Sequence, residues 1–155
     1  MLIYYLCTII CTYHIFNILE YILHILSDKK YMGRLYRWHH IHHTKEFPVT
    51  KLVNNEFISP PIYENIFLQI ALIILIGIYP LLTSVLYSII SIEVLLLIKV
   101  DDYLHMAYHR DNSYLERYNW FRYAKHQHHL HHINTRHNFN IFNNNCDILL
   151  NTIKY

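Results

Sequence analysis

Two long apolar runs restrict the folds that are open to this chain. The first extends from Leu2 to Leu26, and the second from Asn65 to Ile98, where Glu93 is the one charged residue. A helix needs about 20 residues to cross a bilayer core, so the second run is too long for a single pass. Pro80 lies near its middle and interrupts helical hydrogen bonding. We expect an all-α integral membrane protein with about three membrane helices, at 2–26 and in a hairpin over 62–100 with arms 62–79 and 81–100.

The basic residues indicate how these helices are oriented. All 13 Lys and Arg lie between positions 29 and 51 or between 99 and 154. The positive-inside rule then places the polar segments 27–61 and 101–155 in the cytosol. A cleaved signal peptide over 1–26 fits less well, because a basic start is missing and the run is too long. We expect a single domain over 1–155, and the net charge of +2 gives no case for nucleic acid as a partner.

The polar segments carry the pattern His-x-x-His-His twice. The two copies are His39, His42 and His43, and His128, His131 and His132. Neutral imidazole is a common ligand of transition metals, and helical positions i, i+3 and i+4 share one face. We expect each copy to direct three imidazoles at one point, giving two metals or one dinuclear centre. The alternative is a solvated histidine-rich tract, since the chain has 14 histidines.

A further histidine pair follows the hairpin. His105 and His109 are four residues apart, and Asp101 and Asp102 precede His105 by one turn. The spacing puts both imidazoles on one helical face, where a carboxylate can fix their tautomer. We therefore expect two more ligands backed by aspartate. An interfacial helix with ordinary polar residues is the alternative.

The end of the first apolar run carries one more polar stripe. Glu20, His24 and Asp28 are spaced four apart. His24 is a candidate ligand, Asp28 a candidate carboxylate ligand, and Glu20 a candidate acceptor behind them. The alternative is that Glu20 and Asp28 only mark the membrane boundary. The nine histidines, with Asp28 as a candidate tenth donor, would fill two five-coordinate metals. Fewer protein donors would leave open coordination positions, as in a redox or hydrolytic centre rather than a closed structural zinc site.

The order of these motifs resembles the fatty acid hydroxylase / sterol desaturase superfamily of membrane di-iron enzymes. The resemblance runs from about Glu20 to Thr152. It rests on residues 37–43, on 102–105 with His109, on 128–132 with Asn138-Phe139, and on 147–152.

The resemblance implies an O₂-dependent oxidoreductase of lipid biosynthesis that hydroxylates or desaturates a sterol or fatty acyl C–H bond. Two irons would be the cofactor, with zinc able to replace them in isolated protein, and no catalytic residue is expected beyond the metal ligands. The implied partners are the membrane, the lipid substrate and a cytochrome b5-type donor that brings electrons from NAD(P)H. The implied location is the endoplasmic reticulum, with the histidines facing the cytosol.

The chain departs from the family pattern at four positions. Asp28 stands where the family has a histidine, Asn140 and Asn151 stand where it has glycine, and Cys146 stands where it has tryptophan. These departures motivate a second hypothesis, a non-catalytic membrane protein that holds metal. A histidine-rich zinc or copper transporter is a third hypothesis, which the position of the boxes outside the membrane runs disfavours.

Overall fold

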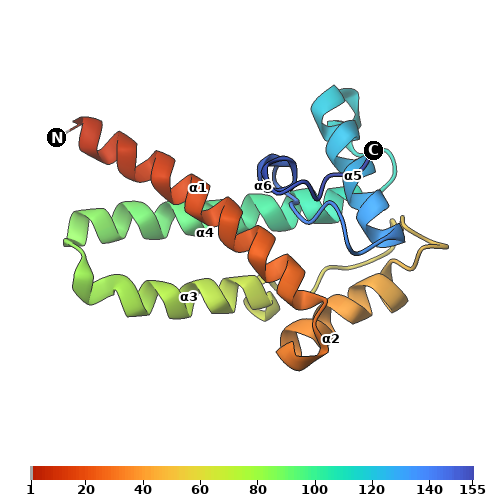
Figure 1. The fold of residues 1–155 in the computed structure, drawn as a ribbon, viewed down its shortest axis with the longest axis horizontal. Coiled ribbons are helices and arrows are strands. Elements are labelled where there is room, and N and C mark those ends of the chain that lie inside the picture. Colours follow the sequence, from red (N-terminus) through yellow and green to blue (C-terminus); the bar gives the residue numbers. More distant parts are fainter. Residues whose placement is uncertain (1) are drawn as a thin grey trace. The chain divides into compact units, whose positions relative to one another are not determined.

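Helices joined by short irregular segments make up the computed structural model, which describes residues 2–155 and contains no strand among them (Figure 1). The α-helices are α1 (Leu2–Ser27), α2 (Arg34–Ile41), α3 (Ile66–Ile78), α4 (Ser84–Tyr108), α5 (Asn119–Ile133) and α6 (Asn145–Leu149). The chain divides into two compact units. One contains the residues up to 16 and 60–101, and the other contains 17–59 and 102–155. The all-α expectation is therefore confirmed for the described residues.

The helix α1 matches the first expected membrane helix. Among the described helices it is the one long and apolar enough to cross a membrane. Its apolar side chains stay exposed along most of its length, as Ile3 and Ile10 illustrate. Apolar side chains exposed on an isolated helix surface are what a lipid environment accommodates.

The expected hairpin forms with different bounds. The side chain of Asn65 accepts hydrogen bonds from the backbone N–H groups of Phe67 and Leu68 at 2.9 and 3.2 Å, so α3 begins there and not at residue 62. Pro80 lies in the turn η4 (Tyr79–Leu81), after which α4 returns antiparallel to α3 (Figure 1). The first arm has 13 residues and the second has 25, ending at Tyr108. Three membrane helices therefore remain a prediction, because α3 is short for a full crossing.

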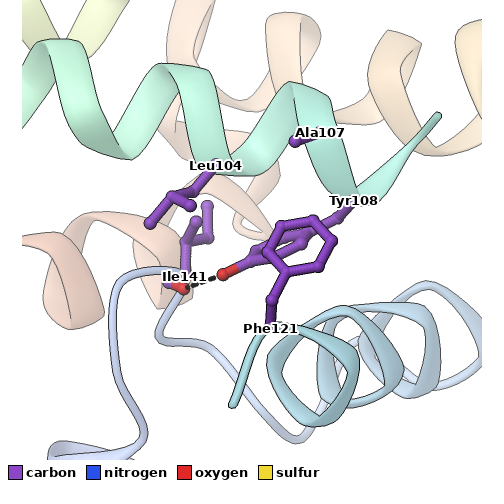
Figure 2. Packing of buried hydrophobic residues seen from close by; sticks show 5 residues of the cluster. All are labelled: Leu104, Ala107, Tyr108, Phe121 and Ile141. Carbon is purple, nitrogen blue, oxygen red and sulfur yellow. Dashed lines mark hydrogen bonds between the residues drawn. The ribbon is translucent and has the colours of Figure 1, made fainter. Parts of the chain in front are cut away.

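The second unit is built on a small apolar core. Leu104, Ala107 and Tyr108 of α4 pack against Phe121 of α5 and Ile141 of the C-terminal segment (Figure 2). The Tyr108 hydroxyl donates a hydrogen bond to the backbone oxygen of Ile141 at 3.0 Å. This core joins the end of α4 to α5. The candidate ligands His105 and His109 lie at the end of α4, and His128, His131 and His132 lie on α5.

Two buried carboxylates hold the C-terminal segment in place. Asp147 accepts hydrogen bonds from the backbone N–H groups of Phe139 and Asn140 at 2.9 and 2.8 Å, and from the Thr152 hydroxyl at 2.7 Å. Glu20 of α1 accepts from the backbone N–H of Ile141 at 2.5 Å. Carboxylates that receive several N–H and O–H donors remain stable when buried. The segment is thereby fixed to α1.

The three bonds of Asp147 predict a large loss of stability on truncation. Asp147→Ala leaves buried donors without an acceptor, so we expect the free energy of unfolding to fall by about 3–5 kcal/mol. Denaturant-induced unfolding in detergent measures this. Asp111→Ala, which removes an exposed aspartate of the same unit, should change it by less than about 0.5 kcal/mol. Equal effects of the two variants would contradict this role of Asp147.

Candidate metal centre

Nine histidines gather within the unit formed by residues 17–59 and 102–155. They come from the end of α1, from α2 and the turn η2 (His42–Glu46), from the end of α4, and from α5. They form two groups, and within each group the candidate ligand atoms all lie within 4.8 Å of one another. Donors about 2.1 Å from a shared metal ion are at most about 4.2 Å apart, so both groups are close to the size that a shared ion requires.

The first group contains five imidazoles, which turn their Nε2 atoms toward one another. Its members are His42, His105, His109, His128 and His132. Neighbouring Nε2 atoms are separated by 2.9–3.2 Å, as between His109 and His128 and between His42 and His109.

The tautomers of this group show that these short distances are not all hydrogen bonds. The Nδ1–H of His109 donates to the backbone oxygen of Leu52 at 2.7 Å, and that of His132 to the backbone oxygen of Phe47 at 3.0 Å. A carbonyl only accepts, so both Nε2 atoms carry lone pairs. A carboxylate beside Nδ1 of His42 favours the same tautomer there. Lone pairs facing one another at 3.2 Å repel unless a cation lies between them, so this donor set fits a metal ion.

The second group contains four imidazoles: His24, His39, His43 and His131. The Nδ1–H of His131 donates to the backbone oxygen of His137 at 2.8 Å, which leaves a lone pair on Nε2. That Nε2 and both ring nitrogens of His43 are buried without a hydrogen-bond partner among the described residues. An unpaired buried polar atom costs about 1–3 kcal/mol, so these nitrogens are suited to a ligand that the protein itself does not supply.

The two groups adjoin each other. The rings of His43 and His132, one from each group, stack with centroids 4.0 Å apart and planes inclined by 15°. His42 and His43 are consecutive in the chain and also belong to different groups. Two ions held here would therefore form one dinuclear centre rather than two remote sites.

The expectation that each His-x-x-His-His copy directs three imidazoles at one point is wrong. His39 and His43 join the second group while His42 joins the first, and His131 is likewise separated from its neighbours in the motif. Viewed along a helix axis, the side chain of residue i+4 points about 40° to one side of residue i, and that of i+3 points about 60° to the other side. The side chains of i+3 and i+4 therefore diverge by about 100°. Each motif thus contributes to both groups.

A π-helical turn introduces a residue that the sequence interpretation missed. The backbone N–H of Phe47 donates to the carbonyl of His42, five residues earlier, at 2.9 Å. Within this turn the Glu46 carboxylate lies 3.4 Å from Nδ1 of His42, on the side away from the other imidazoles. Glu46 therefore orients His42. Its i+4 spacing from His42 was the available signal.

Burial and mutual proximity lower the pKa of several of these imidazoles, which keeps those rings uncharged near neutral pH. Burial lowers the pKa of His109 to about 3 and, together with the neighbouring His39, the pKa of His131 to about 4. The pKa values of His42 and His132 are lowered for the same reasons, since protonating one ring disfavours protonating the next. Neutral imidazole is the form that binds metal.

The expected carboxylates take several positions. Oδ1 of Asp28 lies 3.3 Å from Nε2 of His39. Glu20, expected behind His24, instead binds the backbone N–H of Ile141 and the side-chain amide of Asn140. Asp101 and Asp102 lie half-buried on α4, one turn before His105.

A comparison with protein families identifies the family of this chain. The model of the family described as fatty acid hydroxylase matches residues 9–152. The chain belongs to the fatty acid hydroxylase family. Comparisons with curated proteins and with solved structures found no match. The family is membrane-associated, and together with the histidine groups it indicates a metal-dependent lipid oxidase.

Three departures from the fatty acid hydroxylase pattern are accommodated by the fold. Asn151, at a glycine position, has φ +56°, and asparagine tolerates this left-handed conformation better than most residues. The side-chain amide of Asn140 donates to Glu20, and its oxygen accepts from the backbone N–H of Cys146 at 3.2 Å. Cys146 is buried against Tyr21 and Phe139. The ring centroid of Phe139 lies 5.7 Å from that of His131. The segment around the site is therefore intact.

The lowered pKa values predict an acid-sensitive metal-free protein. An unfolded histidine binds a proton below about pH 6.5, whereas folded His131 does so only below about 4. The unfolded state therefore binds more protons in this window, and the metal-free protein loses stability as the pH falls from about 6.5 to 4. Unfolding midpoints of chelator-treated protein measure this. A midpoint constant across this window would contradict the burial of neutral imidazoles.

The contact of Glu46 with His42 predicts weaker metal binding when the carboxylate is removed. Removing such a supporting group commonly lowers metal affinity about 10–100-fold, and we expect Glu46→Ala to do so. Glu46→Gln keeps an acceptor oxygen beside Nδ1, so its loss should be smaller. Competition with a chelator measures the affinity, and Glu56→Ala, which removes an exposed carboxylate, is the control. Wild-type affinity in Glu46→Ala would show that Glu46 does not orient His42.

Proposed function

We propose that this protein is a membrane-bound, O₂-dependent di-iron oxidoreductase that hydroxylates or desaturates a C–H bond of a lipid, either a sterol or a fatty acyl chain. The nine histidines of the two groups are its metal ligands. The observation that carries this proposal is the convergence of imidazole lone pairs in two adjoining groups. Structural zinc sites, in contrast, are single and closed by four donors.

The chain's own residues hold and orient the metal ligands. Bound iron would supply the activation of O₂ and the abstraction of hydrogen. The backbone oxygens of Leu52, Phe47 and His137 fix the tautomers of three imidazoles, so that lone pairs are presented without rearrangement. No side chain acts as a separate acid or base in this proposal.

The environment of the protein follows from its apolar helices and its charges. The exposed apolar side chains of α1 support a membrane location. The confinement of basic residues to the two histidine-bearing segments supports a cytosolic site, where a cytochrome b5-type carrier delivers electrons from NAD(P)H. Lipid substrate would then reach the site from the bilayer, and the endoplasmic reticulum is the proposed location.

A non-catalytic metal-binding protein is the second candidate. The exchange of a family histidine for Asp28 favours it, because an altered donor set can hold a redox-inactive ion. The two candidates differ in redox behaviour: the enzyme's metal cycles between oxidation states, whereas a structural zinc does not.

Metal content and redox cycling test the proposal. Detergent-purified protein from iron-supplemented cells should contain about two metals per chain with iron present, and its spectrum should change on reduction by dithionite and recover with O₂. A lipid-product screen then follows. A redox-silent centre would reject the enzyme, and a protein without metal would reject both candidates.

Single substitutions in each group extend this test. His42→Ala and His131→Ala each remove a donor from one group, so we expect both to lose metal and to abolish lipid oxidation. His40→Ala is the matched control, because His40 adjoins the same motif but is exposed and belongs to neither group. Wild-type oxidation by either group variant would contradict the ligand assignment.

A further inference from the structure

The end of α1 places a carboxylate next to the four-histidine group. We propose that Asp28 is the fifth protein ligand of this group, so that the two metal sites are chemically unlike, one with five imidazoles and one with four imidazoles and a carboxylate. This inference rests on the proposed function, since it concerns the same pair of metal ions.

The first support is the distance between Asp28 and His39. Oδ1 of Asp28 lies 3.3 Å from Nε2 of His39. Two donors that each bind one metal at about 2.1 Å are about 3.0–3.4 Å apart when they are adjacent in the coordination sphere. In the five-histidine group, neighbouring donors are separated by 2.9–3.2 Å. Asp28 and His39 therefore have the spacing of two donors to one ion.

The second support is the nitrogen that Asp28 faces. Nε2 of His39 is buried and has no hydrogen-bond partner among the described residues. Glu46, the carboxylate beside the other group, faces Nδ1 of His42, whose Nε2 points at the neighbouring imidazoles. The two carboxylates thus occupy different positions. Glu46 lies behind an imidazole, whereas Asp28 lies beside a nitrogen that is free to bind a metal ion.

Helix geometry explains why this position can replace a histidine. Asp28 follows His24 by four residues, and α1 ends at Ser27, whose hydroxyl donates to the backbone oxygen of His24 at 2.5 Å. Asp28 comes directly after the helix, and its backbone N–H donates to the backbone oxygen of Ile25 at 3.4 Å, which holds it in the turn that ends α1. A carboxylate is shorter than an imidazole, and the 3.3 Å approach to His39 shows that it still reaches this member of the group.

The unlike donors give the two sites different preferences. Five neutral imidazoles leave the full charge of the metal ion in a buried site, whereas a carboxylate lowers the net charge by one. An anionic oxygen donor also favours harder ions. The site with Asp28 is therefore the one that holds iron more firmly in the ferric state.

Mössbauer spectroscopy of ⁵⁷Fe-loaded, dithionite-reduced protein tests this assignment. The wild-type protein should give two ferrous doublets of equal area, one for each donor set. Asp28→Asn should change or remove one doublet and leave the other. It should also lower the affinity for that one iron at least about tenfold in competition with a chelator. Asp28→His should keep two irons and bring the doublets together, which gives a result even if Asp28→Asn folds poorly.

The outcomes separate this inference from the proposed function. An asparagine oxygen can still accept a hydrogen bond from His39, so an unchanged pair of doublets in Asp28→Asn would show that Asp28 is not a ligand. A single wild-type environment for both irons would overturn the inference as well. A wild-type protein that binds no iron would instead reject the proposed function. Asp111→Asn, an exposed aspartate of the same unit, is the control and should leave both doublets unchanged.

Discussion

The repulsion between inward-facing imidazole lone pairs is the constraint on which the rest of the structure depends. Hydrogen bonds from Nδ1 to backbone oxygens, such as that from His109 to Leu52, prevent the rings from relieving it by changing tautomer. Protonation does not relieve it either, because burial holds the pKa values far below neutrality. The two buried carboxylates, Glu20 and Asp147, fix the segment that covers His131. Each of these features keeps the lone pairs directed at places that a cation can occupy.

The sequence was sufficient to predict which residues gather, but not how they are divided. Metal-ligand chemistry and helical spacing selected nine histidines, all of which the structure brings together. Helical geometry separates the directions of His42 and His43 by about 100°, but which imidazoles of α4 and α5 join each of them is a tertiary property. The i+4 spacing of Glu46 from His42 is visible in the sequence, but the π-helical turn that contains both residues is not. The hairpin bounds shifted because one residue, Asn65, caps α3.

The departures from the family pattern gain meaning once they are seen in the fold. A glycine position at positive φ has become Asn151, which meets the same backbone requirement. Asn140 replaces another glycine and adds hydrogen bonds to Glu20 and Cys146. These exchanges preserve backbone geometry around the site, whereas Asp28 places a carboxylate 3.3 Å from Nε2 of His39, within the site itself. The chain therefore combines a conserved backbone geometry with a carboxylate where the family pattern has a histidine.

The irregular segment 47–59 has a thermodynamic consequence beyond its role as a connection. Its carbonyls at Phe47 and Leu52 accept hydrogen bonds from imidazoles, and its Asn54 N–H donates to the backbone oxygen of His109 at 2.9 Å. Ordering such a loop costs about 1–2 kcal/mol per residue in conformational entropy. Any ion that stabilises the imidazoles also offsets this cost, so occupancy of the centre and rigidity of the loop are linked quantities. Occupancy of the buried centre therefore bears on the order of a segment that is partly exposed, at Asn55, Glu56 and Ile58.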